Sequence, residues 1–169
     1  METTQMDLQV HYSQAYLVDA DDECYPDGML DDSPTHPVGI IRVEKGNAFL
    51  ITGLHTGTVS FTVAVADQDP GADLEGYEDV VEISFESPSG HVSLYEWGGG
   101  GVHGIPPLSV GPGTYRFRYH AYGMDAAREA DTFDVVIDRY LLRIWPAPHR
   151  DPVVLKSTGS YFQYWLSAG

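Results

Sequence analysis

The sequence has little that would cross-link, export or anchor the chain. Cys24 is the single cysteine among 169 residues, so an intrachain disulfide is excluded. The start, Met-Glu-Thr-Thr-Gln-Met-Asp, has neither the basic head nor the apolar stretch of a signal peptide. No apolar run approaches the roughly 18 residues that cross a bilayer. These absences predict a cytoplasmic protein with no membrane partner.

Basic residues are almost missing from the first two-thirds of the chain. Residues 1–110 hold 19 Asp and Glu against Arg42 and Lys45, a net charge of −17, whereas residues 111–169 hold seven basic and six acidic residues. A negative field of this size repels phosphates and concentrates cations. The charge therefore argues against nucleic acid as a partner and favours a basic protein or a cation.

Catalytic and nucleotide-binding motifs are also missing. The chain has no G-x-S-x-G and no H-E-x-x-H, and its seven histidines are scattered singly. Residues 99–104 have the letters G-x-G-x-x-G, but Ile-Pro-Pro follows where a phosphate-binding loop needs a helix. We therefore expect a non-enzymatic protein without catalytic residues. A hydrolase that uses a carboxylate pair is the remaining enzymatic alternative.

Apolar residues recur with period two, and helical spacing is almost absent. In 58–66 the residues Val59, Phe61 and Val63 share one face, and 80–86 and 114–122 repeat this pattern. Further strands are expected at 8–12, 15–19, 38–44, 48–54, 91–97 and 140–145, and one helical turn at 125–130 with Asp125 as its N-cap. Short strands joined by polar turns predict an all-β fold, an antiparallel β-sandwich of about seven to nine strands in one domain over residues 1–169.

The predicted strand 114–122 carries polar residues on one face. Arg116, Arg118 and His120 share this face, which we expect to point outward because a one-residue slip in register would bury two arginines. Glu82 and Glu86 of the strand at 80–86 are expected to pair with them across the sheet.

Acidic residues gather in two loops, 19–32 and 67–79, which together hold thirteen carboxylates. If both loops emerge at one end of the sandwich, they form one negative surface that steers a basic protein such as a nuclease or toxin. The alternative is dispersed charge that keeps the protein soluble. Trp97 is amphipathic and suits a protein interface, a carbohydrate platform or the core edge. The expected partner-binding residues are Asp19, Asp21, Asp22, Glu23, Asp27, Asp31, Asp32, Glu75 and Trp97.

The second loop offers calcium as an alternative ligand. If Asp67 is the first ligand, then Asp69, Asp73 and Glu78 fall at positions 3, 7 and 12 of a helix-loop-helix calcium loop. Ala72 stands at position 6, where glycine is needed, so the loop is either a rim site of another kind or a solvated turn. We expect no cofactor, with calcium as the alternative that would make the protein a calcium-dependent ligand- or carbohydrate-binding module.

Two stretches carry a resemblance to known families. Residues 105–118, from Ile-Pro-Pro-Leu to Gly-Thr-Tyr-Arg-Phe-Arg, and residues 139–148, Arg-Tyr-Leu-Leu-Arg-Ile-Trp-Pro-Ala-Pro, resemble a group of small actinobacterial β-sandwich proteins. Gly-Pro-Gly-Thr-Tyr at 111–115 is similar to the Pro-x-Gly-x-Tyr that begins a strand in the competence-associated nuclease inhibitors of bacilli, with the proline one place nearer the strand here. The resemblance spans about residues 38–146. It implies a strand-rich cytoplasmic inhibitor or immunity protein that plugs a nuclease, and it transfers no site residue because the acidic loops match no motif of that family.

Overall fold

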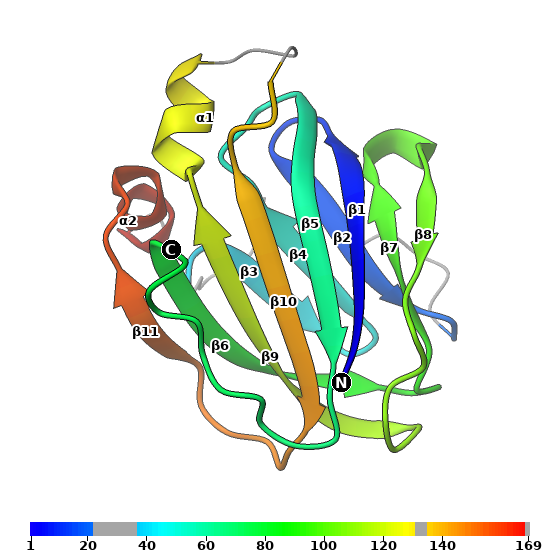
Figure 1. Ribbon diagram of the computed structural model, residues 1–169. Coiled ribbons are helices and arrows are strands. Elements are labelled where there is room, and N and C mark those ends of the chain that lie inside the picture. Colours follow the sequence, from blue (N-terminus) through cyan, green and yellow to red (C-terminus); the bar gives the residue numbers. More distant parts are fainter. Residues whose placement is uncertain (22–36, 131–134, 168–169) are drawn as a thin grey trace.

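Two β-sheets stacked face to face form the body of the protein (Figure 1). The computed structural model describes residues 1–21, 37–130 and 135–167. The strands are β1 (Glu2–Val10), β2 (Gln14–Asp19), β3 (Ile41–Glu44), β4 (Asn47–Ile51), β5 (Gly57–Val65), β6 (Asp79–Ser87), β7 (Val92–Glu96), β8 (Val102–Gly104), β9 (Gly113–Tyr122), β10 (Arg139–Pro146) and β11 (Val153–Ser157). The helical elements are η1 (Trp97–Gly99), α1 (Met124–Ala130) and α2 (Ser160–Ser167).

The larger sheet has the strand order β1-β5-β10-β9-β6-β11, and the smaller has β3-β4-β2-β7-β8. Their facing sides bury alternate apolar residues, as the period-two pattern of β5 requires. Phe61, Tyr119 and Tyr140 stack at the centre with ring centroids 5.7–6.1 Å apart. The core therefore lies between the sheets.

The prediction of an all-β sandwich is confirmed, with 50% strand and 12% helix. The described chain has eleven strands rather than seven to nine, because the short edge strands β8 and β11 carry too few alternating residues to be recognised. The expected antiparallel pairing holds for the described pairs except β5 with β10, where Tyr140 lies opposite Phe61 in a parallel register. No helix in the described ranges is long and apolar enough to cross a membrane.

Helix α2 was not predicted, because the aromatic residues in Ser160–Ser167 favour strands in isolation. Phe162 is fully buried in the core, and the helix continues against the residues that precede β3. A Cβ on Gly39 would lie 3.0 Å from the Leu166 nitrogen, and its φ of +75° also favours glycine. Glycine at this position lets α2 pack close to the chain that leads into the smaller sheet.

The face of β9 that we expected to point outward is buried. Arg116, Arg118 and His120 are at most 5% exposed, and Glu82 is 7% exposed. The expected pairing across the sheet is confirmed for Glu82, whose carboxylate lies 2.9 Å from Arg116 Nε and 2.7 Å from Arg118 Nη2. These side chains lie on the outer face of the sheet, but the expected exposure to solvent was wrong. Residues 66–78 and 147–152 cover this face of the sheet. Alternation identifies the two faces of a strand but not what covers them.

Candidate partner-binding surfaces

One end of the sandwich carries exposed carboxylates. At this end β1 begins and β2, β5 and β6 end, as the pairing of Glu2 with Val65 shows for the larger sheet. Hydrogen bonds from Asp19 N to Gly46 O (2.8 Å) and from Gly46 N to Glu86 O (3.0 Å) bring the β3–β4 turn to the same end. We define the acidic end by its exposed members Glu2, Asp21, Glu44, Asp67 and Glu86.

Lys45 lies among the carboxylates of the acidic end. Its Nζ is 3.2 Å from Glu86 Oε2, and both side chains are more than half exposed, so the pair contributes little stability. In the described chain the other four carboxylates of the acidic end form no ion pair. Residues 22–36, which follow Asp21, contain no Lys or Arg that could neutralise them. The acidic end therefore keeps a negative charge.

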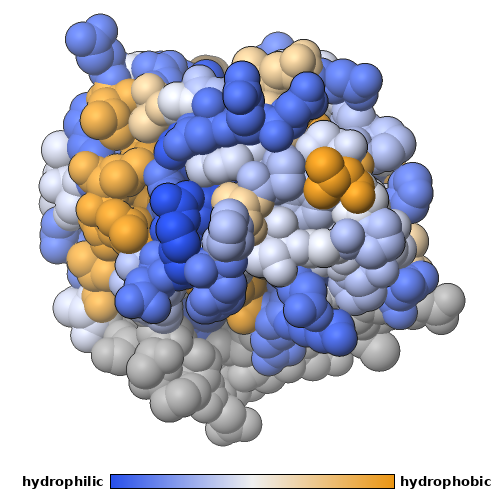
Figure 2. All heavy atoms as spheres, turned by 90° about the horizontal axis from the view of Figure 1, so that it is seen from below, coloured by the Kyte–Doolittle hydropathy of each residue, from blue (hydrophilic) through white to orange (hydrophobic). Residues whose placement is uncertain are grey.

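Figure 2 views this end of the molecule from below and shows hydrophilic side chains over most of it. Apolar side chains gather along one side of the view, the side on which β11 lies in Figure 1. Val153 and Leu155 of this edge strand are 43% and 39% exposed. Hydrophilic side chains thus cover much of the acidic end and border the apolar edge of β11.

Asp19 differs from its expected role in partner binding because it is only 1% exposed. Its carboxylate accepts hydrogen bonds from Ser87 Oγ and from the N–H groups of Asp21 (2.9 Å) and Ser89 (3.3 Å). Burial opposes ionisation, but these hydrogen bonds outweigh it and lower the pKa of Asp19. Asp19 therefore joins the end of β2 to the turn after β6 and is not available to a partner.

The other expected partner residues that the structure describes, Asp21, Glu75 and Trp97, do not meet on one surface. Glu75 lies in the segment that crosses the outer face of the larger sheet, whereas Asp21 follows β2 in the smaller sheet. Trp97 lies at the opposite end of β2 from Asp21, because Ala15 pairs with Glu96. Five residues lie outside the described ranges: Asp22, Glu23, Asp27, Asp31 and Asp32.

Residues 66–78 run along the outer face of the larger sheet from the end of β5 to the start of β6 (Figure 1). Asp69 receives two hydrogen bonds from Arg118, at 2.8 and 3.2 Å, and this guanidinium lowers the pKa of the carboxyl. Arg143 and Lys156 each donate to a main-chain carbonyl of the segment at 2.8 Å. The basic C-terminal strands therefore hold this acidic segment mainly by its backbone, and Asp69 is the one carboxylate of the segment in an ion pair among the described residues.

The four residues expected to bind calcium are used separately. Asp69 contacts Arg118, while Asp73 and Glu78 accept main-chain N–H groups at 2.9 and 2.7 Å. Asp67 lies at the acidic end. Among the residues that the structure describes, no group of three or more His, Cys, Asp and Glu is arranged to hold a metal ion. Calcium binding by this loop stays a prediction.

An exposed aromatic cluster lies at the end opposite the acidic end. Tyr12 and Trp97 are 56% and 38% exposed, and their ring centroids are 5.1 Å apart. His11 lies 5.7 Å from Trp97, and His55 lies 5.2 Å from Tyr12. Trp97 is among the expected partner-binding residues, whereas Tyr12, expected at the end of a strand, lies in the β1–β2 turn. We call these four residues the aromatic cluster.

Tyr12 occupies an unusual backbone position in the β1–β2 turn. Tyr12 and Ser13 have φ values of +55° and +59°, the left-handed region that Asn and Gly prefer in two-residue hairpin turns. The left-handed conformation of each residue lowers the stability of the folded protein by about 1 kcal/mol, because neither residue is Gly or Asn. Ser13 holds the turn by donating its N–H to His55 O (2.9 Å) and its hydroxyl to Leu54 O (3.2 Å). The turn therefore presents Tyr12 rigidly although its sequence is unfavourable there.

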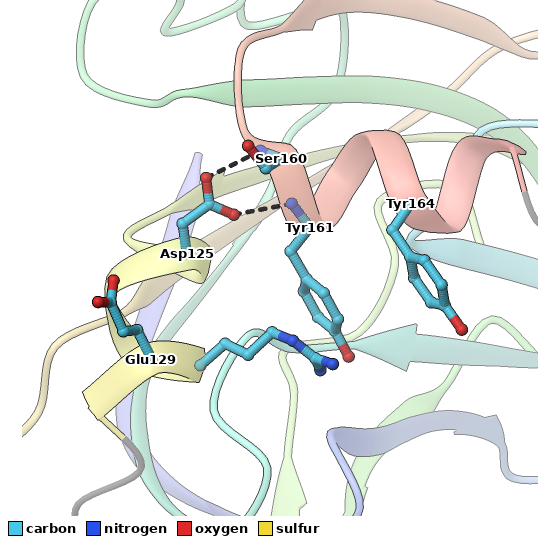
Figure 3. A pocket seen from close by; sticks show the side chains of 6 residues that line it. Asp125, Glu129, Ser160, Tyr161 and Tyr164 are labelled. Atoms are coloured by element: carbon cyan, nitrogen blue, oxygen red, sulfur yellow. Dashed lines mark hydrogen bonds between the residues drawn. The ribbon is translucent and has the colours of Figure 1, made fainter.

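A cavity of about 610 Å³ lies between α1 and α2 (Figure 3). Asp125, expected to cap α1, instead accepts the N–H groups of Ser160 and Tyr161 at 2.8 Å and caps α2. Arg128 lies over the Tyr161 ring, with its guanidinium carbon 4.2 Å from the centroid. Figure 3 shows the Asp125 carboxylate directed at the start of α2. Asp125 and Arg128 of α1 thus already contact α2, and these contacts hold the two helices together.

A scan against protein-family models and a search of the curated proteins gave no match. Two solved structures share the fold. One is ComJ from Bacillus subtilis, described as an inhibitor of the DNA degrading activity of NucA, with a TM-score of 0.54, 12% identity, and coverage of 86% of this chain and 98% of ComJ. The other is the product described as crocagin biosynthetic gene J, with a TM-score of 0.54, 15% identity, and coverage of 87% and 98%. The resemblance to nuclease inhibitors seen in the sequence is therefore confirmed at the level of the fold.

Proposed function

We propose that this protein is a non-enzymatic inhibitor or immunity protein that binds a basic partner protein, such as a nuclease, through its acidic end. The observation that carries the proposal is the group of exposed carboxylates at that end, of which only Glu86 has an ion-pair partner, Lys45, among the described residues. The fold likeness to ComJ, an inhibitor of a DNA-degrading activity, supports the inhibitor class.

The placement of the basic residues supports a basic partner. Arg116 and Arg118 are buried against Glu82, and Arg143 and Lys156 donate to main-chain carbonyls. The residues outside the described ranges contain no Lys or Arg. The surplus negative charge is therefore left for solvent or a partner.

A nuclease binds DNA through a basic cleft, and an acidic surface complements such a cleft. Complementary charge raises the association rate, and the effect is screened by salt. The Debye length falls from about 10 Å at about 0.1 M salt to about 3 Å at about 1 M. Binding through the acidic end should therefore weaken steeply over this range.

The test has two steps. The purified protein is used to capture a nuclease from the source organism, and inhibition of that nuclease by the protein is then measured. The acidic-end variant combines Asp21→Asn, Glu44→Gln and Asp67→Asn. The control variant removes the same charge elsewhere, through Asp7→Asn, Glu75→Gln and Glu129→Gln, all at exposed positions. We expect the acidic-end variant to lose inhibition and the control to keep it. Equal inhibition by both variants, or binding that ignores salt, would contradict the proposal.

A further inference from the structure

The aromatic cluster is uncharged at its surface in a protein of net charge −16. The segments that build it, residues 9–15, 52–57 and 96–104, contain no Lys or Arg. Tyr and Trp are the side chains most enriched where proteins bind one another tightly. β1 separates this cluster from the acidic end by nine residues, about 30 Å at the usual rise per residue. It is therefore a second surface and not part of the acidic end.

The cluster is held in a fixed geometry. The β1–β2 turn is tied to the chain at Leu54 and His55, and Tyr12 contacts both His55 and Trp97. Strained residues persist where the surroundings hold them, and they gather at functional sites. More than half of the Tyr12 side chain is nevertheless exposed, so burial in the core does not explain why tyrosine stands in this turn.

A hydrogen-bonded carboxylate lies next to the aromatic cluster in the chain. Glu96 precedes Trp97 and accepts the N–H groups of Gln9 (2.9 Å) and Gly101 (2.8 Å), while His103 lies 3.1 Å from Oε2. Burial opposes its ionisation, but the hydrogen bonds from Gln9, His103 and Gly101 outweigh it and lower the pKa of Glu96. A negative charge is therefore held in place at the residue that precedes Trp97.

Five aromatic rings of the described chain already contact an arginine. Guanidinium carbons lie 3.9–5.8 Å from ring centroids in five contacts: Arg42 with Trp165, Arg118 with Trp145, Arg128 with Tyr161, and Arg139 with Tyr77 and Tyr122. No described Lys or Arg makes such a contact with Tyr12 or Trp97. These two rings are thus available to a cation from outside the molecule.

We propose that the aromatic cluster is a docking site for an arginine side chain of a basic polypeptide, with the guanidinium stacked on Tyr12 and Trp97 and attracted by the negative charge of the protein. This docking site rests on the proposed function, because the proposed function is the reason to expect a basic partner. Arginine fits better than lysine because its guanidinium is planar, weakly hydrated and stacks on aromatic faces. A nucleic acid or a second copy of this chain is disfavoured, because each carries the same negative sign as the protein.

The test measures binding of two short peptides of equal charge, one rich in arginine and one rich in lysine, by calorimetry. We expect tighter binding of the arginine peptide, and a loss of about fivefold in its affinity in Trp97→Leu and in Tyr12→Asn. Asn tolerates the backbone of this turn, so Tyr12→Asn should fold with an unchanged melting temperature. Tyr164→Leu is the matched control, since Tyr164 is 58% exposed on α2, and it should bind as the original protein does.

Three outcomes would overturn the docking site. The first is equal affinity for both peptides, and the second is arginine-peptide binding that Trp97→Leu leaves unchanged. The third is binding of a neutral oligosaccharide to these rings without any response to the arginine peptide. If affinity falls only in the acidic-end variant, the docking site is wrong and the proposed function stands. If the peptide result holds but no nuclease is inhibited, the proposed function fails instead.

Discussion

The acidic end and the covered face of the larger sheet both contain carboxylates, but they use them in opposite ways. On the covered face, Glu82 is buried between Arg116 and Arg118, and Asp69 lies against the same Arg118. At the acidic end, Asp21, Glu44 and Asp67 point into solvent without an ion pair in the described chain. The number of carboxylates in a segment does not separate these cases. The two cases differ in the position of the nearest cation. Strand pairing places Arg118 opposite Glu82 and therefore fixes this position on the covered face.

The sharpest way to break this comparison is to remove Glu82. Glu82→Ala leaves two buried guanidinium groups without their shared carboxylate and should lower the free energy of unfolding by about 3–5 kcal/mol. Glu86→Ala, which removes an exposed pair with Lys45, should cost less than about 1 kcal/mol. Urea denaturation of both variants measures the difference. Equal losses would mean that the covered face is solvated in solution.

His120 should make the covered face sensitive to acid. It is fully buried, its Nδ1 lies 3.1 Å from Leu141 O, and its Nε2 accepts the N–H of Asp73 at 3.2 Å. Burial lowers its pKa to about 4, and Arg143 and Arg118 act in the same direction. The unfolded chain, with the ordinary pKa of 6.5, therefore binds a proton before the folded protein does.

Stability from neutral His120 is thus complete above pH about 6.5 and is lost as pH falls toward about 4, by about 3 kcal/mol. His120→Gln should flatten this part of the stability profile. Thermal unfolding across the range checks the effect, with His149→Gln as the exposed control. A slope that His120→Gln leaves unchanged would assign the pH dependence to other groups.

Asp69→Asn tests whether the second acidic segment serves the fold or a metal. Its pair with Arg118 is two-pronged but about half exposed on the carboxylate side, so we expect a loss of about 1 kcal/mol. The loss should be the same in EDTA and in calcium. If calcium raises the melting temperature of the original protein and this variant abolishes the rise, the calcium prediction is supported instead.

The acidic-end variant should change stability least. Asp21→Asn, Glu44→Gln and Asp67→Asn remove repulsion between exposed like charges, and the free energy of unfolding should stay within about 0.5 kcal/mol of its original value. Urea denaturation next to the inhibition assay checks this result. A large destabilisation would show that these carboxylates serve the fold, as Glu82 does.

The alternation of apolar and polar residues predicted the strands well where a strand has a paired neighbour on both sides. β5, β6 and β9 lie inside the larger sheet, and their expected ranges differ from the observed ones by only a residue or so. β8 and β11 lie at sheet edges and were missed. α2 was missed because its helical state depends on the Asp125 cap and on burial of Phe162, which are tertiary contacts.

The candidate surfaces were only partly predictable. The excess of negative charge could be seen in the sequence. The exposure of Trp97 and the burial of Asp19 could not, and the burial depends on Ser87 from a distant strand. Tyr12 gave no signal, because Tyr-Ser is not a usual hairpin turn and only the left-handed backbone reveals it.

The parallel pairing of β5 with β10 has a consequence for how the chain folds. These strands are neighbours in space, yet β6, β7, β8 and β9 lie between them in the chain. Closing so long a loop costs entropy before any contact is gained, and chains dominated by distant pairings fold in milliseconds to seconds. β10 also pairs with β9, so its insertion joins β1 and β5 to the rest of the larger sheet. Until that late step, the newly made chain exposes two unpaired strand edges, which makes this interval its period of greatest risk of aggregation.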